Sequence, residues 1–187
     1  MLILRKIYYI LFDLIQTLVI AGAIFVVIYA FLFRPYQVNG LSMYPNFDNG
    51  EYILTNLISK RITTYEKGDV IVFHSPTEKS KDFIKRIIGT EGDTVSLSEG
   101  KVFVNGKMLE EDYLPSNYVT NDGSFLPEGA QVKVPADNFF VMGDNRSNSS
   151  DSREWGFVSK DEIIGKSFFV YWPITKMRVV EHAEIDI

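Results

Sequence analysis

The sequence predicts a mainly β domain that follows one N-terminal transmembrane helix. Residues 14–33 form an apolar run of twenty residues without a charged side chain. Residues 34–187 instead contain many short runs of β-branched and aromatic residues, and none of these segments has a convincing 3.6-residue period. Short strands with frequent turns favour a β-barrel or a sandwich-like sheet.

The apolar run is long enough to cross a bilayer. At 1.5 Å per residue it spans about 30 Å, the thickness of the hydrocarbon core, and residues 7–12 can extend it. A buried core helix is one alternative, although core helices seldom stay apolar on every side over this length. A cleaved signal peptide is another, with Ala21-Gly22-Ala23 as the cleavage site. That triplet lies inside the run, whereas a signal peptide has an apolar region of about 7–15 residues. We expect an uncleaved anchor.

Basic residues around the run predict its orientation. Arg5 and Lys6 lie before it, and Arg34 alone lies close after it. The positive-inside rule then places the N-terminus in the cytoplasm. We therefore expect a single-pass protein of the cell membrane, with residues 1–33 as cytoplasmic stub and anchor and residues 34–187 as an extracytoplasmic domain in contact with the lipid bilayer.

The expected strands follow from the β-rich runs and the turns between them. Asn105-Gly106 predicts a two-residue hairpin turn, and residues 98–100 form a hairpin-length loop. Residues 159–164 could form one helical turn, 116–129 a long loop, and 101–136 a small inserted cap lobe. The expected strands are 51–58, 69–74, 83–88, 94–97, 101–104, 107–109, 131–134, 138–142, 167–171 and 177–180.

Composition excludes several classes of function. The chain has 187 residues, enough for one domain with an appendage, and it contains no Cys and only two His. Disulfides and thiolate catalysis are excluded, and a zinc enzyme is disfavoured. The net charge of −5 disfavours a nucleic-acid partner. No cofactor is expected, and no sequence feature specifies an oligomeric state.

Three segments could carry chemistry. Residues 40–45, Gly-Leu-Ser-Met-Tyr-Pro, are either a turn or a site that holds the Ser42 hydroxyl as a nucleophile near the bilayer. In residues 83–89, strand alternation places Lys85 on one face with Phe83, and Arg86 on the other with Ile84. Both faces are mostly apolar, so at least one cation lies among hydrophobic groups. It either snorkels, forms an ion pair, or is a lysine whose pKa falls enough to act as a general base.

The third segment, residues 143–153, is a polar loop between two apolar runs. It is either a flexible linker or an ordered loop that supports a site, in which Asp144 and Asp151 pair with Arg146 and Arg153. A Ser-His-Asp triad based on His74 is a further alternative. No sequence feature gives His74 an orienting carboxylate, so the triad is disfavoured.

In this order, behind a membrane span, these segments resemble the type I signal peptidases, the membrane-bound Ser-Lys endopeptidases of bacteria, and the single span resembles the Gram-positive form. The resemblance rests on Ser42-Met43-x-Pro45, on Gly68-Asp69-Val70-Ile71-Val72-Phe73, on Lys85-Arg86-Ile87-Ile88-Gly89 with Gly92-Asp93, and on the loop 143–153. It implies a signal-peptidase-like β domain that removes signal peptides from exported preproteins, after small residues at positions −1 and −3.

The resemblance also implies roles for individual residues. Ser42 would be the nucleophile, Lys85 the general base, and Ser149 the hydroxyl that positions the lysine. The backbone N–H of Ser42 would serve the oxyanion hole, with Gly40 nearby where some relatives carry a serine. Asn46 stands where the family often has threonine, which puts no catalytic role in doubt. A polar frame would comprise Asp144, Arg146, Asp151 and Arg153, and the substrate, an extended strand, would lie against Tyr36, Gln37, Val38, Gly40, Asp82, Phe83 and Ile84.

Two other functions compete with this one. The chain could be a binding or scaffold protein that holds preproteins without cutting them, which the intact Ser42 and Lys85 argue against. It could also be a self-cleaving Ser-Lys protein similar to bacterial repressors, which the anchor and the acidic charge disfavour.

Overall fold

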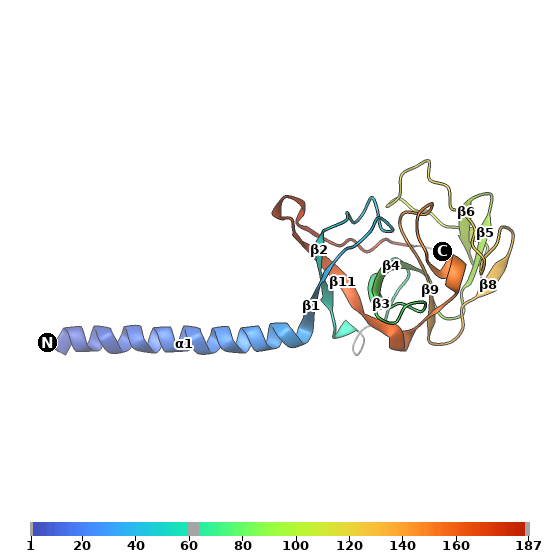
Figure 1. The fold of residues 1–187 in the computed structure, drawn as a ribbon. Coiled ribbons are helices and arrows are strands. Elements are labelled where there is room, and N and C mark those ends of the chain that lie inside the picture. Colours follow the sequence, from blue (N-terminus) through green and yellow to red (C-terminus); the bar gives the residue numbers. More distant parts are fainter. Residues whose placement is uncertain (1, 60–63, 186–187) are drawn as a thin grey trace.

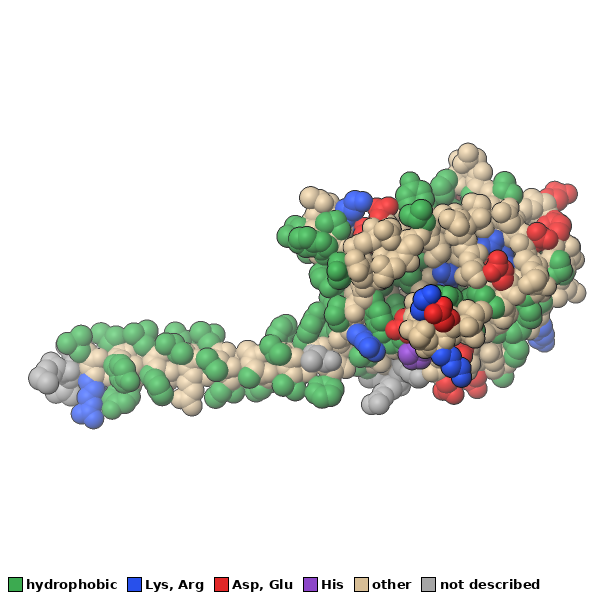
Figure 2. All heavy atoms as spheres, in the orientation of Figure 1, with side chains coloured by type: hydrophobic (Ala, Val, Ile, Leu, Met, Phe, Trp, Pro, Cys, Tyr) green, Lys and Arg blue, Asp and Glu red, His purple; other side chains and the backbone are tan. Residues whose placement is uncertain are grey.

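A computed structural model describes residues 2–59 and 64–185. The helix α1 (Leu2–Leu32) projects as a rod from a β domain (Figure 1). Its segment Leu4–Tyr29 is long and apolar enough to cross a membrane, and none of it is buried by the rest of the chain. Apolar side chains cover the rod (Figure 2). The alternative of a buried core helix is therefore wrong.

The helix ends one residue earlier than the predicted anchor. Phe33, counted as part of the span, begins strand β1 (Phe33–Gln37). Pro35 explains the change, because a proline disfavours helical geometry in the preceding residue and cannot donate an N–H to a helix. Strand β1 is not predicted from the sequence, because its first residue continues the apolar run.

One large antiparallel sheet carries most of the domain. Its order is β1-β2-β11-β3-β4-β9-β10, and β12 pairs with β11. The strands predicted for this sheet are present in the structure. Strand β11 is longer than the predicted strand 167–171, and β10 is not predicted. The strands are β2 (Tyr52–Asn56), β3 (Val70–His74), β4 (Asp82–Gly89), β9 (Asn138–Met142), β10 (Val158–Ser159), β11 (Ile163–Trp172) and β12 (Arg178–Val179).

A second, four-stranded sheet has the order β7-β6-β5-β8. Its strands are β5 (Thr94–Ser98), β6 (Lys101–Val104), β7 (Lys107–Met108) and β8 (Gln131–Lys133). Asn105 and Gly106 both have positive φ and join β6 to β7, as the Asn-Gly signal predicts. The lobe begins at Thr94, before the expected residue 101, because β6 pairs with β5.

Short helical elements connect several of the strands in the described part of the chain. Helix α3 (Ser152–Trp155), not foreseen, is capped by the Asp151 side chain. The 3₁₀ turn η1 (Lys160–Glu162) has a capping box between Ser159 and Glu162, and it is shorter than the helical turn considered for residues 159–164 because Ile163 begins β11. A second 3₁₀ turn, η2 (Ile174–Lys176), joins β11 to β12.

Two hydrophobic clusters support the two sides of the site described below. One lies under the segment after β1 and includes Val38, Met43, Phe47 and Ile53. The other lies under β4 and includes Ile71, Phe73, Ile87, Val141 and Ile163. Buried apolar side chains therefore hold both segments in place independently of the polar contacts between them.

Candidate active site

Ser42 lies in the loop between β1 and β2. The neighbouring Met43 and Phe47 are 1% and 2% exposed, so they hold this loop on the core. Phe47 N–H donates to Met43 O at 2.9 Å, and Gly40 N–H donates to Asn49 Oδ1 at 2.7 Å. Gly40 has φ +104°, a conformation that a side chain at this position would strain. The segment is thus the turn that its Gly, Ser and Pro predict, and it presents the Ser42 hydroxyl.

Lys85 meets that hydroxyl from the neighbouring strand β4. Its Nζ lies 2.8 Å from Ser42 Oγ and 3.0 Å from Ile84 O, and only 4% of the residue is exposed. The Phe83 ring lies 5.4 Å from the same nitrogen. Burial lowers the pKa of the Lys85 ammonium from 10.5 to about 8, against the opposing attraction of Asp151 and Asp144. This is the direction that the apolar alternation of the strand predicts.

Arg86 points to the opposite side of β4. It donates two hydrogen bonds to Asp144, at 2.9 and 2.8 Å, and one to Gly68 O. Asp144 Oδ2 also accepts from the Asn46 side chain at 2.8 Å. Both members of the ion pair are buried, so Asp144 ties β4 to the loop that carries Ser42.

The pairing expected inside the loop 143–153 is only partly right. Asp151 pairs with Arg153, but Asp144 pairs with Arg86, and Arg146 pairs with Glu111 of the small lobe. Sequence reasoning missed Glu111, which is buried, because nothing in the local sequence around Glu111 marks it as a partner. Tyr113 and Tyr118 also donate their hydroxyls to Glu111.

The loop is ordered and it holds the Ser42 segment in place. Asn145 N–H donates to Ser42 O at 3.0 Å, and the Asn145 side chain donates to Leu41 O at 3.0 Å. Gly143 N–H donates to Asp151 Oδ2 at 3.0 Å. Burial raises the pKa of Asp151, but hydrogen bonds from Arg153 and Gly143 outweigh it, and the net pKa is lowered. The alternative of a flexible linker is therefore wrong.

Ser149 lies near the site, but no hydrogen bond between it and Lys85 is found among the described residues. The hydrogen bonds of Lys85 Nζ go to Ser42 and Ile84. In the part of the chain that the structure describes, the buried Ser149 Oγ has no hydrogen-bond partner of good geometry, although Ser149 helps to lower the pKa of Asp151. A Cβ on Gly143 would lie 2.2 Å from this Oγ and 2.4 Å from Ser42 O, so the packing requires glycine there.

A cleft of about 240 Å³ runs along the Ser42–Lys85 pair. Its lining includes the predicted substrate residues other than Gly40, together with Ile53 and Val72. In the described part of the chain, β1 pairs only with β2, and residues 82–85 of β4 pair only with β3. Each wall of the cleft therefore presents a strand edge to which an extended peptide can pair.

His74 does have a carboxylate partner, contrary to the expectation from sequence. Its Nδ1 lies 2.8 Å from Asp82 Oδ1, because the two residues are register partners on β3 and β4. Both side chains are partly exposed, and the Ser42 Oγ bonds to Lys85 rather than to His74. No group of three or more potential metal-ligating side chains was found among the described residues.

Comparisons with known proteins identify the family. The family model described as "Signal peptidase, peptidase S26" matches residues 11–172. The chain is 40% identical over 171 residues to signal peptidase I of Bacillus amyloliquefaciens, with 87% of this chain and 86% of the relative covered.

The chain belongs to the signal peptidase S26 family. It is 34% identical over 179 residues to signal peptidase IB of Staphylococcus aureus, covering 90% of this chain and 93% of that protein. The crystal structure of a signal peptidase I from Enterococcus faecalis is 30% identical and has a TM-score of 0.47, covering 55% of this chain and 96% of that one. The chain is therefore a serine peptidase of a family that removes signal peptides from preproteins.

Proposed function

We propose that this signal peptidase cleaves exported preproteins by a Ser-Lys dyad, with Ser42 as nucleophile and Lys85 as general base. The observation that carries the proposal is the 2.8 Å contact between Lys85 Nζ and Ser42 Oγ, combined with a lysine pKa of about 8. A lysine can serve as a base only while it is neutral, and burial supplies that condition near neutral pH.

The reaction proceeds in two stages. Neutral Lys85 takes the proton from Ser42 as Oγ attacks the scissile carbonyl, and the protonated lysine then donates to the leaving amine. The acyl-serine is hydrolysed by a water molecule that Lys85 activates. The backbone N–H of Ser42 stabilises the oxyanion, and it carries more of this role because Gly40 offers no hydroxyl.

The loop 143–153 keeps this geometry. Asp144 connects Arg86 to Asn46, and the Asp151–Arg153 pair holds Gly143. Arg146 also stabilises the loop, because its Nε donates a hydrogen bond to Gly143 O at 3.1 Å. Ser149 lies beside this frame with its Oγ buried, and we propose that this hydroxyl helps to position the lysine.

The substrate pairs as an extended strand with the cleft edges. Val38, Ile53, Val72 and Ile84 line the cleft with apolar side chains. We propose that these apolar side chains receive small residues at positions −1 and −3 of the substrate, as in the family that the sequence resembles. We further propose that residues 1–33 anchor the enzyme in the cell membrane and that residues 34–187 act outside the cytoplasm, where a site near the bilayer meets membrane-inserted leaders at high effective concentration.

The test is cleavage of a preprotein by the detergent-solubilised full chain. Mass spectrometry of the products should give one cut at the end of the signal peptide, after small residues at −1 and −3, and Ser42→Ala should give none. An intact preprotein that co-purifies with the wild-type chain would instead support a binding protein. A cut within the chain itself, without cleavage of the preprotein, would support self-cleavage.

A further inference from the structure

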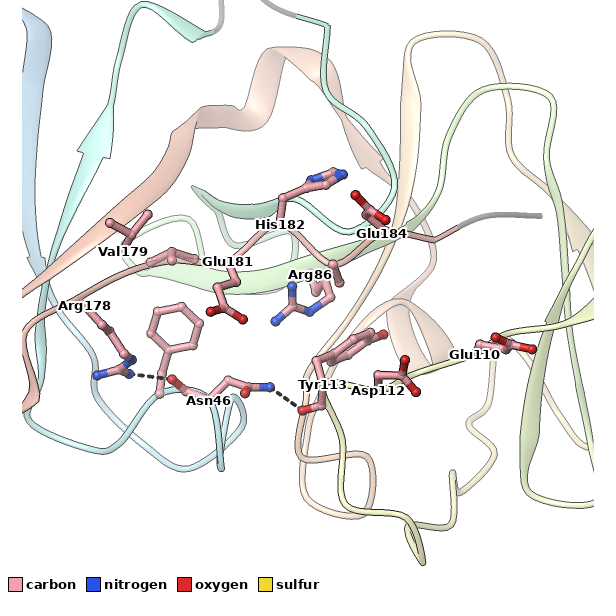
Figure 3. Close-up of a pocket in the computed structure, with 13 residues that line it drawn as sticks. Asn46, Arg86, Glu110, Asp112, Tyr113, Arg178, Val179, Glu181, His182 and Glu184 are labelled. Atoms are coloured by element: carbon pink, nitrogen blue, oxygen red, sulfur yellow. Dashed lines mark hydrogen bonds between the residues drawn. The ribbon is translucent and has the colours of Figure 1, made fainter.

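The C-terminal segment after η2 lies outside the region that matches the family model, residues 11–172. Residues 178–185, here called the C-terminal strap, begin with β12 on the large sheet and continue past the side of the site opposite the cleft. Figure 3 shows the strap above Asn46 of the nucleophile loop and beside Arg86 of β4. A cavity of about 740 Å³ separates these parts, and both the strap and the site loops line it.

The first end of the strap holds the loop that carries Ser42. Arg178 donates to both carboxylate oxygens of Glu51, at 2.8 and 2.7 Å, and to Asn46 O at 2.5 Å. The Glu51 side chain is 2% exposed and also accepts the Asp48 N–H at 3.1 Å. A bidentate pair of this kind fixes orientation as well as distance.

The second end of the strap holds the turn that precedes β3 and supports β4. His182 Nδ1 lies 2.8 Å from the buried carboxylate of Asp69, and Ile185 is 9% exposed in the core of the small lobe. The backbone of Ala183 passes so close to Gly68 that a Cβ there would lie 1.9 Å from Ala183 O. Gly68 O accepts from Arg86 at 2.8 Å, and Asp69 O accepts from Ile87 N at 2.9 Å. These contacts hold the two residues that follow Lys85 on β4.

We infer that the C-terminal strap sets the distance between Ser42 and Lys85, with Arg178 and His182 as positioning residues. This inference rests on the dyad proposed above. The strap contacts the nucleophile side through Arg178 and the base side through His182 and Ala183, across a cavity that the two sides do not fill. Asn46 and Arg86 are also connected across this cavity through Asp144 and through Tyr113, whose carbonyl accepts from Asn46 and whose ring lies 4.2 Å from the Arg86 guanidinium carbon.

The decisive variant is Arg178→Ala, assayed on a preprotein at a temperature where circular dichroism shows it fully folded. Because a displacement of about 1 Å at a reacting centre costs about 100-fold in rate, we expect kcat to fall by about 10- to 100-fold with little change in KM. Millimolar methylguanidinium, which can enter the cavity beside Arg178, should restore part of kcat, whereas urea at the same concentration should not. His182→Ala should also lower kcat with little change in KM, but its loss of kcat should be smaller than that of Arg178→Ala.

Lys176→Ala is the matched control. Lys176 also pairs with a carboxylate of the same loop, Asp48, but both side chains are largely exposed, so kcat should stay at the wild-type value. If Arg178→Ala fails to fold, Arg178→Lys carries the test, because lysine keeps the charge but loses the bidentate geometry. A folded Arg178 variant with wild-type kcat, or an equal loss in Lys176→Ala, would overturn the inference. Failure of the wild-type chain to cleave would instead refute the proposed function.

Discussion

Lys85 Nζ lies 2.8 Å from Ser42 Oγ, although the two residues are 43 positions apart in the chain. The serine is presented by a turn whose apolar anchors are Met43 and Phe47, and the lysine by a strand that is buried from Lys85 onward. The contact therefore depends on the packing of two separate segments and on the polar loop that ties them together.

Ser42→Ala should abolish preprotein cleavage and leave the fold intact. The hydroxyl is at a turn and makes one contact with Lys85, so the free energy of unfolding should change by about 1 kcal/mol or less. Product formation is followed by mass spectrometry, and unfolding by urea titration. If a folded Ser42→Ala protein cleaved at the wild-type rate, Ser42 would not be the nucleophile and the Ser-Lys mechanism would be refuted.

The sequence predicts the parts of the site that local patterns encode. Alternation along residues 83–88 places Lys85 among apolar neighbours, and the structure buries it at 4% exposure. Gly and Pro around Ser42 predict its turn. The Asn105-Gly106 hairpin follows from the same local chemistry, because few residues accept two successive positive φ angles.

The sequence does not predict contacts that arise only when distant strands meet. Arg86 pairs with Asp144, and Arg146 with Glu111, because folding brings together segments that share no local signal. His74 gains Asp82 through the register of β3 with β4. Strand β1 is not predicted for another reason. Its first residue, Phe33, suits a lipid-facing helix as well as a strand, so the apolar run gives no sign of where the helix ends.

His74→Ala should change activity only modestly. Removing a triad histidine lowers kcat by about 10⁶-fold, whereas for His74, which pairs with Asp82 and does not contact Ser42 Oγ by a hydrogen bond, we expect a loss of less than about ten-fold. Asp82→Asn is a companion variant that removes the charge of the same pair. Complete loss of activity in folded His74→Ala, measured by the same cleavage assay, would revive the Ser-His-Asp alternative.

Asp144→Ala should destabilise the protein strongly. It leaves the Arg86 guanidinium buried without its carboxylate, and breaking a buried ion pair from one side costs about 3–5 kcal/mol. Urea unfolding measures the loss. Lys81→Ala is the control, because the Lys81–Glu78 pair is exposed to solvent and should contribute little to stability. Equal effects of the two variants would contradict the structural role given to Asp144.

Protease added outside intact spheroplasts should digest the domain formed by residues 34–187. The expectation follows from the apolar helix α1 and from Arg5 and Lys6 at its N-terminal end. Immunoblotting for the C-terminal part of the chain gives the readout, with a cytoplasmic protein as the integrity control. Protection until the cells are lysed would reverse the proposed orientation.

Lys85→Met should be inactive and yet at least as stable as the wild-type protein below pH 8. Burial lowers the folded pKa of Lys85 to about 8 from 10.5, so between these values the folded state binds fewer protons than the unfolded state. The free energy of unfolding of the wild-type protein therefore rises with pH across that window, and burying the charged amine destabilises the fold below it. Methionine keeps the packing and removes the free-energy cost of burying the charged amine, which is at most about 3 kcal/mol. The net gain in stability is smaller than this cost, because the variant also loses the hydrogen bonds of Lys85 to Ser42 and Ile84. Its stability advantage over the wild type should shrink as pH rises from 8 to 10.5, as urea unfolding at a series of pH values measures.

The same pKa sets the pH dependence of activity. A solvated lysine is only about 0.4% neutral at pH 8, whereas a lysine with a pKa of about 8 is half neutral there. The acid limb of kcat/KM should therefore rise through pH 8 and then level off. Lys85→Arg should be inactive at every pH, because a guanidinium does not deprotonate in this range. Activity in Lys85→Met, or a pKa near 10.4 from direct titration of Lys85, would exclude this residue as the general base.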